Sequence, residues 1–455
     1  MTLPAAFLKS LQGIIGFSPE AFEQVHQSGK QVTSVRLNPA KTDGVLPPEF
    51  VSLAEAIPWT GLGYYLRQRP SFTFDPLFHA GNYYVQEASS MFLEQALLQL
   101  TQRAEPVKVL DLCASPGGKS THLQSLLPAG SLLVSNDVIR SRAAVLRDNI
   151  VKWGAEQVVV TNNDPKDFAG LESFFDVLVV DAPCSGSGLF RRDPEAIGEW
   201  SLNNVQLCSQ RQQRILADCW PALKENGLLI YSTCSYSREE DEEIMDWIKQ
   251  ELDAENCPLT IKEEWGIVET ESPGGSLGYR FWPDRINGEG FFLACFRKRN
   301  GDEPGKMNSK KQPERVTRAE KEWVARWMNI AGKELIKYQQ TVYAWPEDHF
   351  QDFSILLEKM RVIYSGVKSG ELMRDKMVPD HSLAMSGLVL ADVPGIDLVA
   401  EDAIRYLQRK EIRLEGVPTG WSRACFAGKS LGWMNILPGR INNYYPKELR
   451  ILKDI

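Results

Sequence analysis

The sequence predicts an α/β protein built around a Rossmann-like parallel sheet. Between Val107 and Thr233, short continuous apolar runs alternate with segments of helical spacing, a pattern typical of parallel strands buried on both faces. The residues best suited to chemistry follow the ends of these runs, where parallel sheets bind their ligands. Residues 381–455 differ, because short β-like runs and Gly/Pro turns there predict a small β-rich module.

The elements of the central sheet are expected in a regular order. Strands are predicted at Val107–Cys113, Ser131–Ser135, Val158–Thr161, Asp176–Asp181 and Gly227–Thr233, and helices at Ser120–Leu127, Ser141–Trp153 and Val205–Leu223. Because helical segments follow the first, second and fourth of these strands, the strands are expected to run parallel, with helices on both faces.

The chain of 455 residues is long enough for about three domains. The segment Arg297–Val316 is rich in Lys, Gly, Pro and Asn and is interpreted as a linker that ends the sheet domain. A partly helical region with Trp323, Trp327 and Trp345 follows it. The C-terminal module contains β-like runs at Leu388–Leu390, Ile412–Leu414 and Ala424–Phe426. These features divide the chain into residues 1–75, 76–300, 301–380 and 381–455.

Composition excludes several classes of protein. With 43% hydrophobic and 24% charged residues the chain is neither disordered nor membrane-spanning, since no apolar run approaches the roughly 18 residues that a span needs. Met1–Phe17 lacks the pattern of a secretory signal, so we expect a cytoplasmic protein with reduced thiols. The eight cysteines include no C-x-x-C pair, and none of the five histidines lies close to another, so no metal site is expected.

The net charge of −8 argues at first against nucleic acid as a partner. The charge is unevenly distributed, however. Residues 101–300 carry 21 basic and 30 acidic side chains, whereas residues 401–455 carry 10 basic and 6 acidic ones. A basic tail beside an acidic enzyme body is compatible with a polyanionic partner.

The loop after the first predicted strand is suited to a ligand. A Pro-Gly-Gly turn before a helix lets the backbone approach a ligand closely and offers amide donors. Asp137 follows the second strand, where an acidic residue typically accepts hydrogen bonds from ribose hydroxyls, and Asp164 follows the third, where it could lie near an adenine edge. Ribose and adenine without a phosphate-binding motif suit S-adenosylmethionine. The alternative is a tight turn with two surface aspartates. The residues of the predicted cofactor loop are Cys113, Ala114, Ser115, Pro116, Gly117, Gly118 and Lys119.

Two further strands end at thiols, Cys184 and Cys234, the first of them beside Asp181. Methylation of cytosine C5 needs a thiolate that adds to C6 and a second group that removes the C5 proton. Asp181 could stabilise the adduct at the N3/N4 edge of the base, and Lys119 could favour the thiolate. Spacing alone does not decide which thiol is the nucleophile, and two buried core cysteines remain the alternative.

An acidic run follows Cys234. Ser237 with Glu240 three residues later matches a capping box, so this run is interpreted as the start of a helix and not as a metal site.

These motifs together resemble the Nol1/Nop2/Sun family of RNA 5-methylcytosine methyltransferases. The resemblance is carried by CASPGGKS (113–120), Asp137, Asp164, DAPCSGSG (181–188) and STCSYSREEDEE (232–243), with weaker likeness at YVQEASSM (84–91), VRLN (35–38) and 278–298. The tail, with LGW (431–433) and NNYYPKELR (442–450), is similar to the PUA-type module of the bacterial RsmF branch, which methylates small-subunit (16S) ribosomal RNA. Asp284 departs from the pattern, since relatives often have His there.

The resemblance implies a role for each matching residue. Cys234 would be the nucleophile, Cys184 would assist proton removal and product release, and Asp181 would serve both cytosine and cofactor. S-adenosylmethionine would be held by the loop 113–119 with Asp137, Arg142, Asp164 and Asp181. The VRLN segment, residues 1–75 and the PUA-like residues 381–455 would contact RNA.

The resemblance implies that the partner is ribosomal RNA in the small subunit, and neither DNA nor a membrane. It also implies a monomeric enzyme. DNA cytosine methyltransferases use the thiol of a Pro-Cys pair as the nucleophile, and here that thiol would be Cys184. The assignment of Cys234 as the nucleophile therefore rests on the resemblance to the RNA methyltransferase family alone. The remaining alternatives are an assembly factor that keeps the fold without the chemistry, and a DNA methyltransferase.

Overall fold

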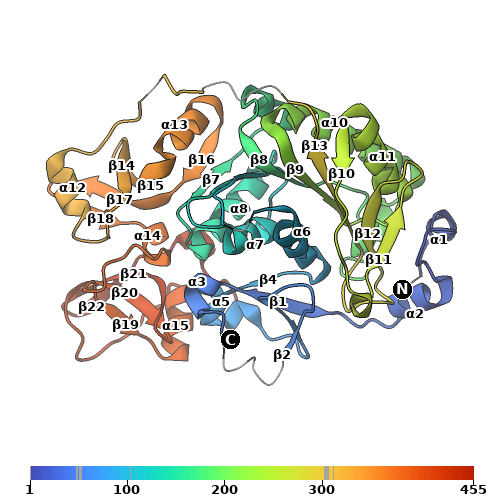
Figure 1. Cartoon of the computed structure of the whole chain (residues 1–455). Helices are drawn as coiled ribbons and strands as arrows, with labels where there is room; N and C mark the ends of the chain where they lie inside the picture. Colours follow the sequence, from blue (N-terminus) through green and yellow to red (C-terminus); the bar gives the residue numbers. More distant parts are fainter. Residues whose placement is uncertain are drawn as a thin grey trace.

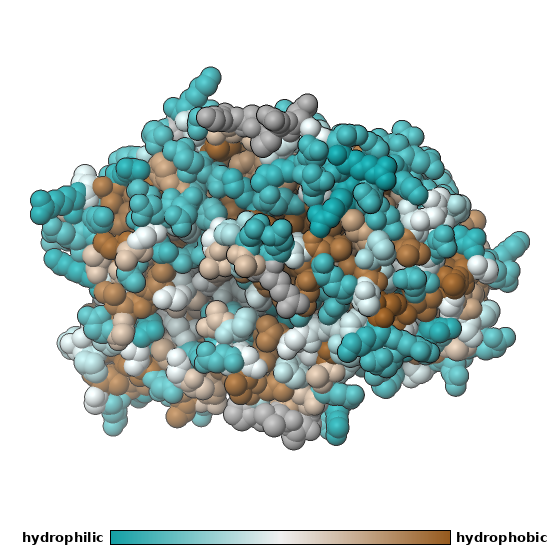
Figure 2. Space-filling view, viewed as in Figure 1, coloured by the Kyte–Doolittle hydropathy of each residue, from teal (hydrophilic) through white to brown (hydrophobic). Residues whose placement is uncertain are grey.

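The computed structural model describes residues 2–47, 50, 54–102, 104–301, 307–310 and 312–454. Their strands form four sheets, one in each part of the chain (Figure 1). The central sheet occupies the upper middle of the view, and the N-terminal sheet lies beneath it. The sheets of the two later parts, in orange and red, lie side by side at the left. Hydrophilic side chains cover much of the visible face (Figure 2).

The central sheet has the order β11-β12-β13-β9-β8-β5-β6-β7-β16, and β10 pairs with β13. Its strands β5 to β9 are parallel, and β13 is antiparallel to β9. The predicted parallel sheet is therefore confirmed. The strands are β5 (Lys108–Asp111), β6 (Leu132–Asn136), β7 (Val158–Thr161), β8 (Phe175–Asp181), β9 (Leu223–Thr233), β10 (Ala254–Asn256), β11 (Val268–Glu271), β12 (Leu277–Phe281), β13 (Phe291–Lys298) and β16 (Val362–Ser365).

Helices cover both faces of this sheet because alternate residues of each strand point to opposite sides. Val177 and Val179 of β8 pack toward α6, α7 and α8, whereas Leu178 and Val180 pack toward α10, α11 and α13. The helices are α6 (Leu93–Leu100), α7 (Gly118–Leu126), α8 (Arg140–Trp153), α9 (Ala196–Glu199), α10 (Leu202–Cys219), α11 (Glu242–Glu251) and α13 (Phe350–Lys359). The expected helices correspond to α7, α8 and α10.

The N-terminal sheet has the order β2-β3-β1-β4 and is tied to the core by buried polar groups. Its elements are α1 (Ala5–Ser10), α2 (Pro19–Gln27), β1 (Thr33–Leu37), α3 (Pro39–Thr42), β2 (Ala54–Ala56), β3 (Gly63–Leu66), α5 (Pro76–His79) and β4 (Tyr83–Val85). Arg36 of β1 is fully buried and donates to Thr121 Oγ1 (2.6 Å) and the Gly118 carbonyl (3.3 Å). Asn38 donates to the Trp153 carbonyl (3.0 Å). The expectation that VRLN contacts RNA is wrong for these side chains, because Val35, Arg36, Leu37 and Asn38 are all buried.

The intermediate part contains a sheet that the tryptophan pattern did not indicate. Trp323 lies on a helix, as expected, but Trp345 lies on a strand. Strand β16 also belongs to this part of the chain, but it pairs with β7 and so extends the central sheet. Residues 302–306 and 311 of the expected linker lie outside the described residues. The elements are α12 (Arg318–Val324), β14 (Lys333–Tyr338), β15 (Thr341–Pro346), β17 (Val367–Met373) and β18 (Lys376–Pro379).

The C-terminal part is β-rich, as predicted, but two of its three expected runs are not strands. Leu388–Leu390 makes only an isolated bridge, Val389 to Met328, and Ile412–Leu414 is irregular, with Ile412 filling the core. Short apolar runs that fill a core without pairing have the same sequence signature as strands. The elements are α14 (His381–Met385), β19 (Gly395–Asp397), α15 (Ala400–Leu407), β20 (Gly420–Phe426), β21 (Lys429–Leu437) and β22 (Arg440–Asn443). No helix within the described ranges has the length and apolarity to cross a bilayer.

Candidate functional site

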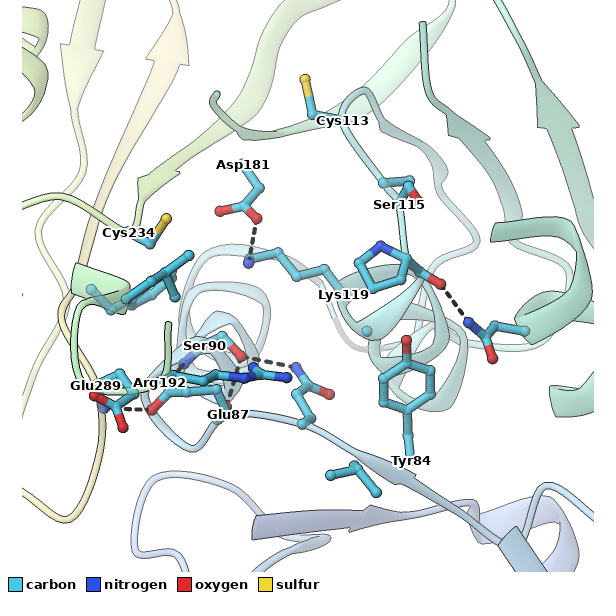
Figure 3. A pocket seen from close by; sticks show the side chains of 18 of the residues that line it. Tyr84, Glu87, Ser90, Cys113, Ser115, Lys119, Asp181, Arg192, Cys234 and Glu289 are labelled. Carbon is cyan, nitrogen blue, oxygen red and sulfur yellow. Dashed lines mark hydrogen bonds and ion pairs between the residues drawn. The ribbon is translucent and has the colours of Figure 1, made fainter. Parts of the chain in front are cut away.

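A cavity of about 450 Å³ opens beyond the carboxyl ends of β5, β8 and β9, where the core meets the N-terminal sheet (Figure 3). It brings together residues from six separated stretches of the chain. They are Phe78, Tyr84, Val85, Gln86, Glu87 and Ser90, then Cys113, Ala114, Ser115, Pro116, Gly118 and Lys119, then Asn149, Lys152, Asp181, Leu189 and Arg192, and last Cys234, Glu289, Gly290 and Phe291.

The predicted cofactor loop is held by neighbouring elements. Ala114 N–H donates to the Asn136 carbonyl (2.8 Å), and Asn149 Nδ2 donates to the Pro116 carbonyl (2.8 Å). Gly117 has φ of +112°, and a Cβ there would lie 3.3 Å from Leu146, so only glycine fits without strain. Helix α7 begins at Gly118, and Gly118 and Lys119 line the cavity; the first amides of a helix have no intrahelical partner.

Lys119 and Asp181 form the charged centre of the cavity. Lys119 Nζ lies 2.8 Å from Asp181 Oδ2 and points toward it in Figure 3. Ser232 Oγ donates to the other carboxylate oxygen (2.8 Å) because Asp181 and Ser232 are paired across β8 and β9. Burial disfavours the ammonium form of Lys119, but the Asp181 and Asp111 carboxylates outweigh it and raise its pKa. The Lys119 charge is therefore matched first to Asp181 and only secondarily to a thiol.

The two predicted thiols are adjacent. Cys184 Sγ and Cys234 Sγ lie 3.1 Å apart, and both cysteines are free. The hydrogen bond to Cys234, followed by burial, raises the pKa of Cys184 well above its usual range. Either sulfur can donate in this contact, and the raised pKa favours the protonated form of Cys184. Cys234 lines the cavity, whereas Cys184 does not.

Glu240 holds the two cysteine loops together, and its interpretation as part of a capping box is wrong. Its carboxylate accepts from Ser185 N–H (2.7 Å), Ser185 Oγ (2.5 Å) and Ser235 Oγ (2.6 Å), the residues that follow the two cysteines. Ser237 makes no side-chain cap, and its Oγ is buried without a partner. Helix α11 begins at Glu242, so a helix does follow this run. The competing partners come from a distant loop, which local spacing does not show.

A second group of polar residues was missed by the sequence reasoning. Glu87 accepts from Ser90 N–H and from Glu289 N–H (both 2.9 Å), which ties the segment before α6 to the start of β13. Burial raises the pKa of Glu289 to about 7, although Arg191 opposes this. YVQEASSM contains Glu87 and Ser90, so the resemblance was the only signal for this group. Arg192 extends across the cavity beside Glu289 in Figure 3.

Besides Gly117, four predicted residues lie around the cavity without lining it. Asp137 is buried at the end of β6, and its carboxylate accepts from Ile139 N–H (2.9 Å) and lies 3.4 Å from Arg142 Nε. Arg142 Nη2 donates to the Ser115 carbonyl (3.0 Å). Asp164 caps the 3-10 helix that follows β7. Cys184 lies next to Cys234, with the two Sγ atoms 3.1 Å apart.

The donor set fits S-adenosylmethionine. Gly118 and Lys119 at the start of α7 and the Asp181 carboxylate line the cavity, so backbone amides can bind the carboxylate and Asp181 the amine of the methionine end. Gly117 and the buried Asp137 lie outside the lining. No cluster of cationic groups that would demand a triphosphate lies on the loop.

Comparisons with known proteins agree with this geometry. Residues 97–297 match the family described as 16S rRNA methyltransferase RsmB/F, residues 3–88 the N-terminal domain of 16S rRNA methyltransferase RsmF, and residues 394–451 the methyltransferase RsmF PUA domain. Ribosomal RNA small subunit methyltransferase F of Shewanella sp. (strain MR-4) is 30% identical over 423 residues, which cover 87% of this chain and 85% of the relative. The protein of the same name from Vibrio parahaemolyticus is 28% identical and covers 98% and 97%.

Solved structures show the same fold. A methyltransferase homologue from Pyrococcus horikoshii is 26% identical with a TM-score of 0.53, covering 64% of this chain and 94% of its own. NSun6 from Pyrococcus horikoshii with SFG, an S-adenosylmethionine analogue, is 17% identical with a TM-score of 0.53, covering 65% and 98%. With the cavity at the strand ends and matches to the catalytic, N-terminal and PUA regions, the chain belongs to the RsmF family of 16S rRNA methyltransferases.

Proposed function

We propose that this chain transfers a methyl group from S-adenosylmethionine to C5 of a cytosine in small-subunit (16S) ribosomal RNA. The observation that carries the proposal is the pair of thiols 3.1 Å apart beside the Lys119–Asp181 ion pair. Family membership and the names of the relatives support the RNA substrate. A neighbour determined with an S-adenosylmethionine analogue supports the cofactor.

Each thiol has a distinct task in this proposal. Cys234 adds as a thiolate to C6 of cytosine, which makes C5 nucleophilic, and Asp181 stabilises the adduct at the N3/N4 edge. S-adenosylmethionine supplies the methyl group to C5. Cys184, 3.1 Å from Cys234 Sγ, is the second group. After it has released its own proton to solvent, its thiolate takes the C5 proton, the electron pair of the C5–H bond restores the C5–C6 double bond, and the bond from C6 to Cys234 Sγ breaks to return the Cys234 thiolate.

The cofactor contacts are proposed from position. The loop 113–119 would hold the methionine end, together with Asp181. Asp137 would accept from the ribose hydroxyls, while Arg142 would brace the loop through the Ser115 carbonyl. Asp164 would shape the turn at the adenine end, because its carboxylate is already used as a helix cap.

The order of the two cysteines gives the sharpest test. Wild type, Cys184→Ala and Cys234→Ala are incubated with small-subunit RNA or 30S particles and labelled S-adenosylmethionine, and products are separated on denaturing gels. Cys184→Ala is expected to accumulate a covalent RNA–protein adduct, and Cys234→Ala to form none. Cys257→Ala is the control, because it removes a half-buried thiol that follows β10. This variant should behave as wild type. An adduct in Cys234→Ala alone would exchange the roles, and no label in 5-methylcytosine on either substrate would refute the activity.

A further inference from the structure

A second cavity, of about 340 Å³, lies between the intermediate and C-terminal parts of the chain. It is formed where α12 and β18 face β20 and the segment before β19. In Figure 2, hydrophobic and pale side chains are exposed at the left, in the region where these elements lie in Figure 1. None of the residues that line this cavity lines the methyl-transfer cavity. The proposed reaction therefore does not account for it.

Aromatic rings form much of the wall. Trp323, Trp327 and Trp421 line the cavity, and all three are only partly buried. The Trp327 and Trp421 rings meet edge to face at 5.9 Å, and Trp421 lies 4.4 Å from the ring of Tyr444, which is 40% exposed. Buried Met377 and Val393 form the floor. Trp327 also packs on buried Trp433 (5.6 Å), so the wall is fixed by the core.

The rim of the cavity carries charged side chains that form no ion pair with other described residues. Arg326, Lys376 and Asp392 line it and are exposed. Within the described ranges, no ion pair involves any of the three. Unpaired cations beside exposed indole rings are the arrangement by which proteins hold single-stranded nucleic acid, with the rings under the bases and the cations at the phosphates.

We propose that this cavity binds one unstacked base of the RNA substrate. The base stacks on Trp421 and Trp327, and Arg326 and Lys376 contact the flanking phosphates. Asp392 can accept a hydrogen bond from an N–H of the base edge. The inference rests on the proposed function only in taking RNA as the substrate.

Size and charge favour a base over a protein segment. A volume of about 340 Å³ is at the lower end for ligand sites and admits one aromatic ring system but not a helix. The C-terminal part, residues 381–455, carries 10 basic and 8 acidic side chains, and its basic excess lies in residues 401–455, with 10 basic and 6 acidic ones, which complements a polyanion. The site would thus fix the RNA at a distance from the reacting cytosine.

The test measures binding of full-length protein to an in vitro transcript of small-subunit RNA and to short single-stranded fragments of it, without cofactor. Trp421→Ala is expected to weaken binding on the order of 10-fold, because one base stack is lost, while Trp421→Phe keeps most of the affinity. Neither should change the salt dependence, whereas Arg326→Gln should lower the slope of log K against log salt by about one phosphate contact. Tyr338→Ala removes a 68% exposed aromatic residue of the intermediate part that does not line the cavity and should have no effect.

Abasic substitution separates stacking from a structural effect. A fragment with one base removed at the stacked position should bind wild type about as weakly as Trp421→Ala binds the intact fragment, and should lose nothing further with that variant. Unchanged affinity of Trp421→Ala, or equal losses with every abasic position, would overturn the proposal. Loss of binding to 30S particles but not to naked RNA would assign the cavity to a protein partner and also overturn it. Because binding is measured without methyl transfer, failure of the proposed chemistry would not be mistaken for failure of this site.

Discussion

Replacement of Glu240 should separate the structural support of the two cysteines from their chemistry. In Glu240→Ala, the buried Ser185 amide and the Ser185 and Ser235 hydroxyls lose their acceptor. At about 1–3 kcal/mol for each buried unsatisfied group, and with partial rescue between hydroxyls that lie 3.5 Å apart, the free energy of unfolding should fall by about 3–5 kcal/mol. For a domain of this size that lowers Tm by on the order of 10 °C.

The Glu240→Gln variant should behave differently, and its pH dependence has a defined sign. Burial raises the pKa of Glu240, and the hydrogen bonds from Ser185 and Ser235 oppose this without cancelling it. The protonated carboxyl therefore stabilises the folded state fully below the pKa of the unfolded chain, and this stabilisation is lost as pH rises through the raised pKa. Gln imitates the protonated form at every pH. The stability of Glu240→Gln relative to wild type should consequently increase with pH across that interval.

Thermal unfolding followed by near-UV circular dichroism between pH 4 and 9, with methyl transfer measured in parallel, tests both statements. Glu239→Ala, on the neighbouring and more exposed residue, is the control and should unfold as wild type does. A Glu240→Ala protein with wild-type Tm and activity would refute the view that this carboxylate fixes the two cysteine loops. A stability of Glu240→Gln that falls relative to wild type as pH rises would refute the reasoning on its pKa.

Two further predictions concern the packing around the site. Arg280 is buried against Asp241 Oδ2 (3.0 Å) and the Glu242 carboxylate, so Arg280→Met should cost about 3–5 kcal/mol by leaving both carboxylates without a cation; urea unfolding measures this, and a loss below about 1 kcal/mol would contradict it. A Cβ at Gly290 would overlap the Tyr236 ring and the Gly188 backbone, so Gly290→Ala should destabilise the fold by about 1–3 kcal/mol and slow methyl transfer. Gly198→Ala, with open space around its Cβ, should change neither quantity, and equal effects of the two substitutions would disprove the packing argument.

The sequence was sufficient for the parallel sheet and for the residues at its strand ends. Buried parallel strands give continuous apolar runs, and the topology then forces Cys113, Asp181 and Cys234 to one edge of the sheet. Residues far apart in the chain could therefore be assigned to one site from the order of the strands alone. The same reasoning could not detect the intermediate sheet, because its strands are only partly buried and lack continuous apolar runs, and its most visible signal was tryptophan.

The polar support of the site could not be predicted from local patterns. Glu240 fitted a capping box by spacing, yet its carboxylate binds Ser185, 55 residues away. Arg36 fitted an RNA-contacting motif by resemblance, yet it is buried and holds the helix that carries Lys119. In both cases the residue type and position were informative, but the partner comes from another part of the fold. Tertiary packing determines which side chains contact one another, and local patterns in a single sequence do not show these contacts.

The distribution of charge determines which surfaces of the molecule can bind RNA. The acidic residues of the core do not all face solvent, since Asp111, Asp241, Glu240 and Glu242 are buried, and each contacts an internal donor or Arg280. The surface is therefore less acidic than the net charge of −8 suggests. Deleting residues 385–455 would not be a clean test of RNA binding by the tail, because Trp433 belongs to the core shared with the intermediate part. Substitutions that remove the charge of Arg326 or Lys376 at the rim of the second cavity change the electrostatics and leave that core intact, so they can show whether RNA is held between the intermediate and C-terminal parts while the acidic core performs the chemistry.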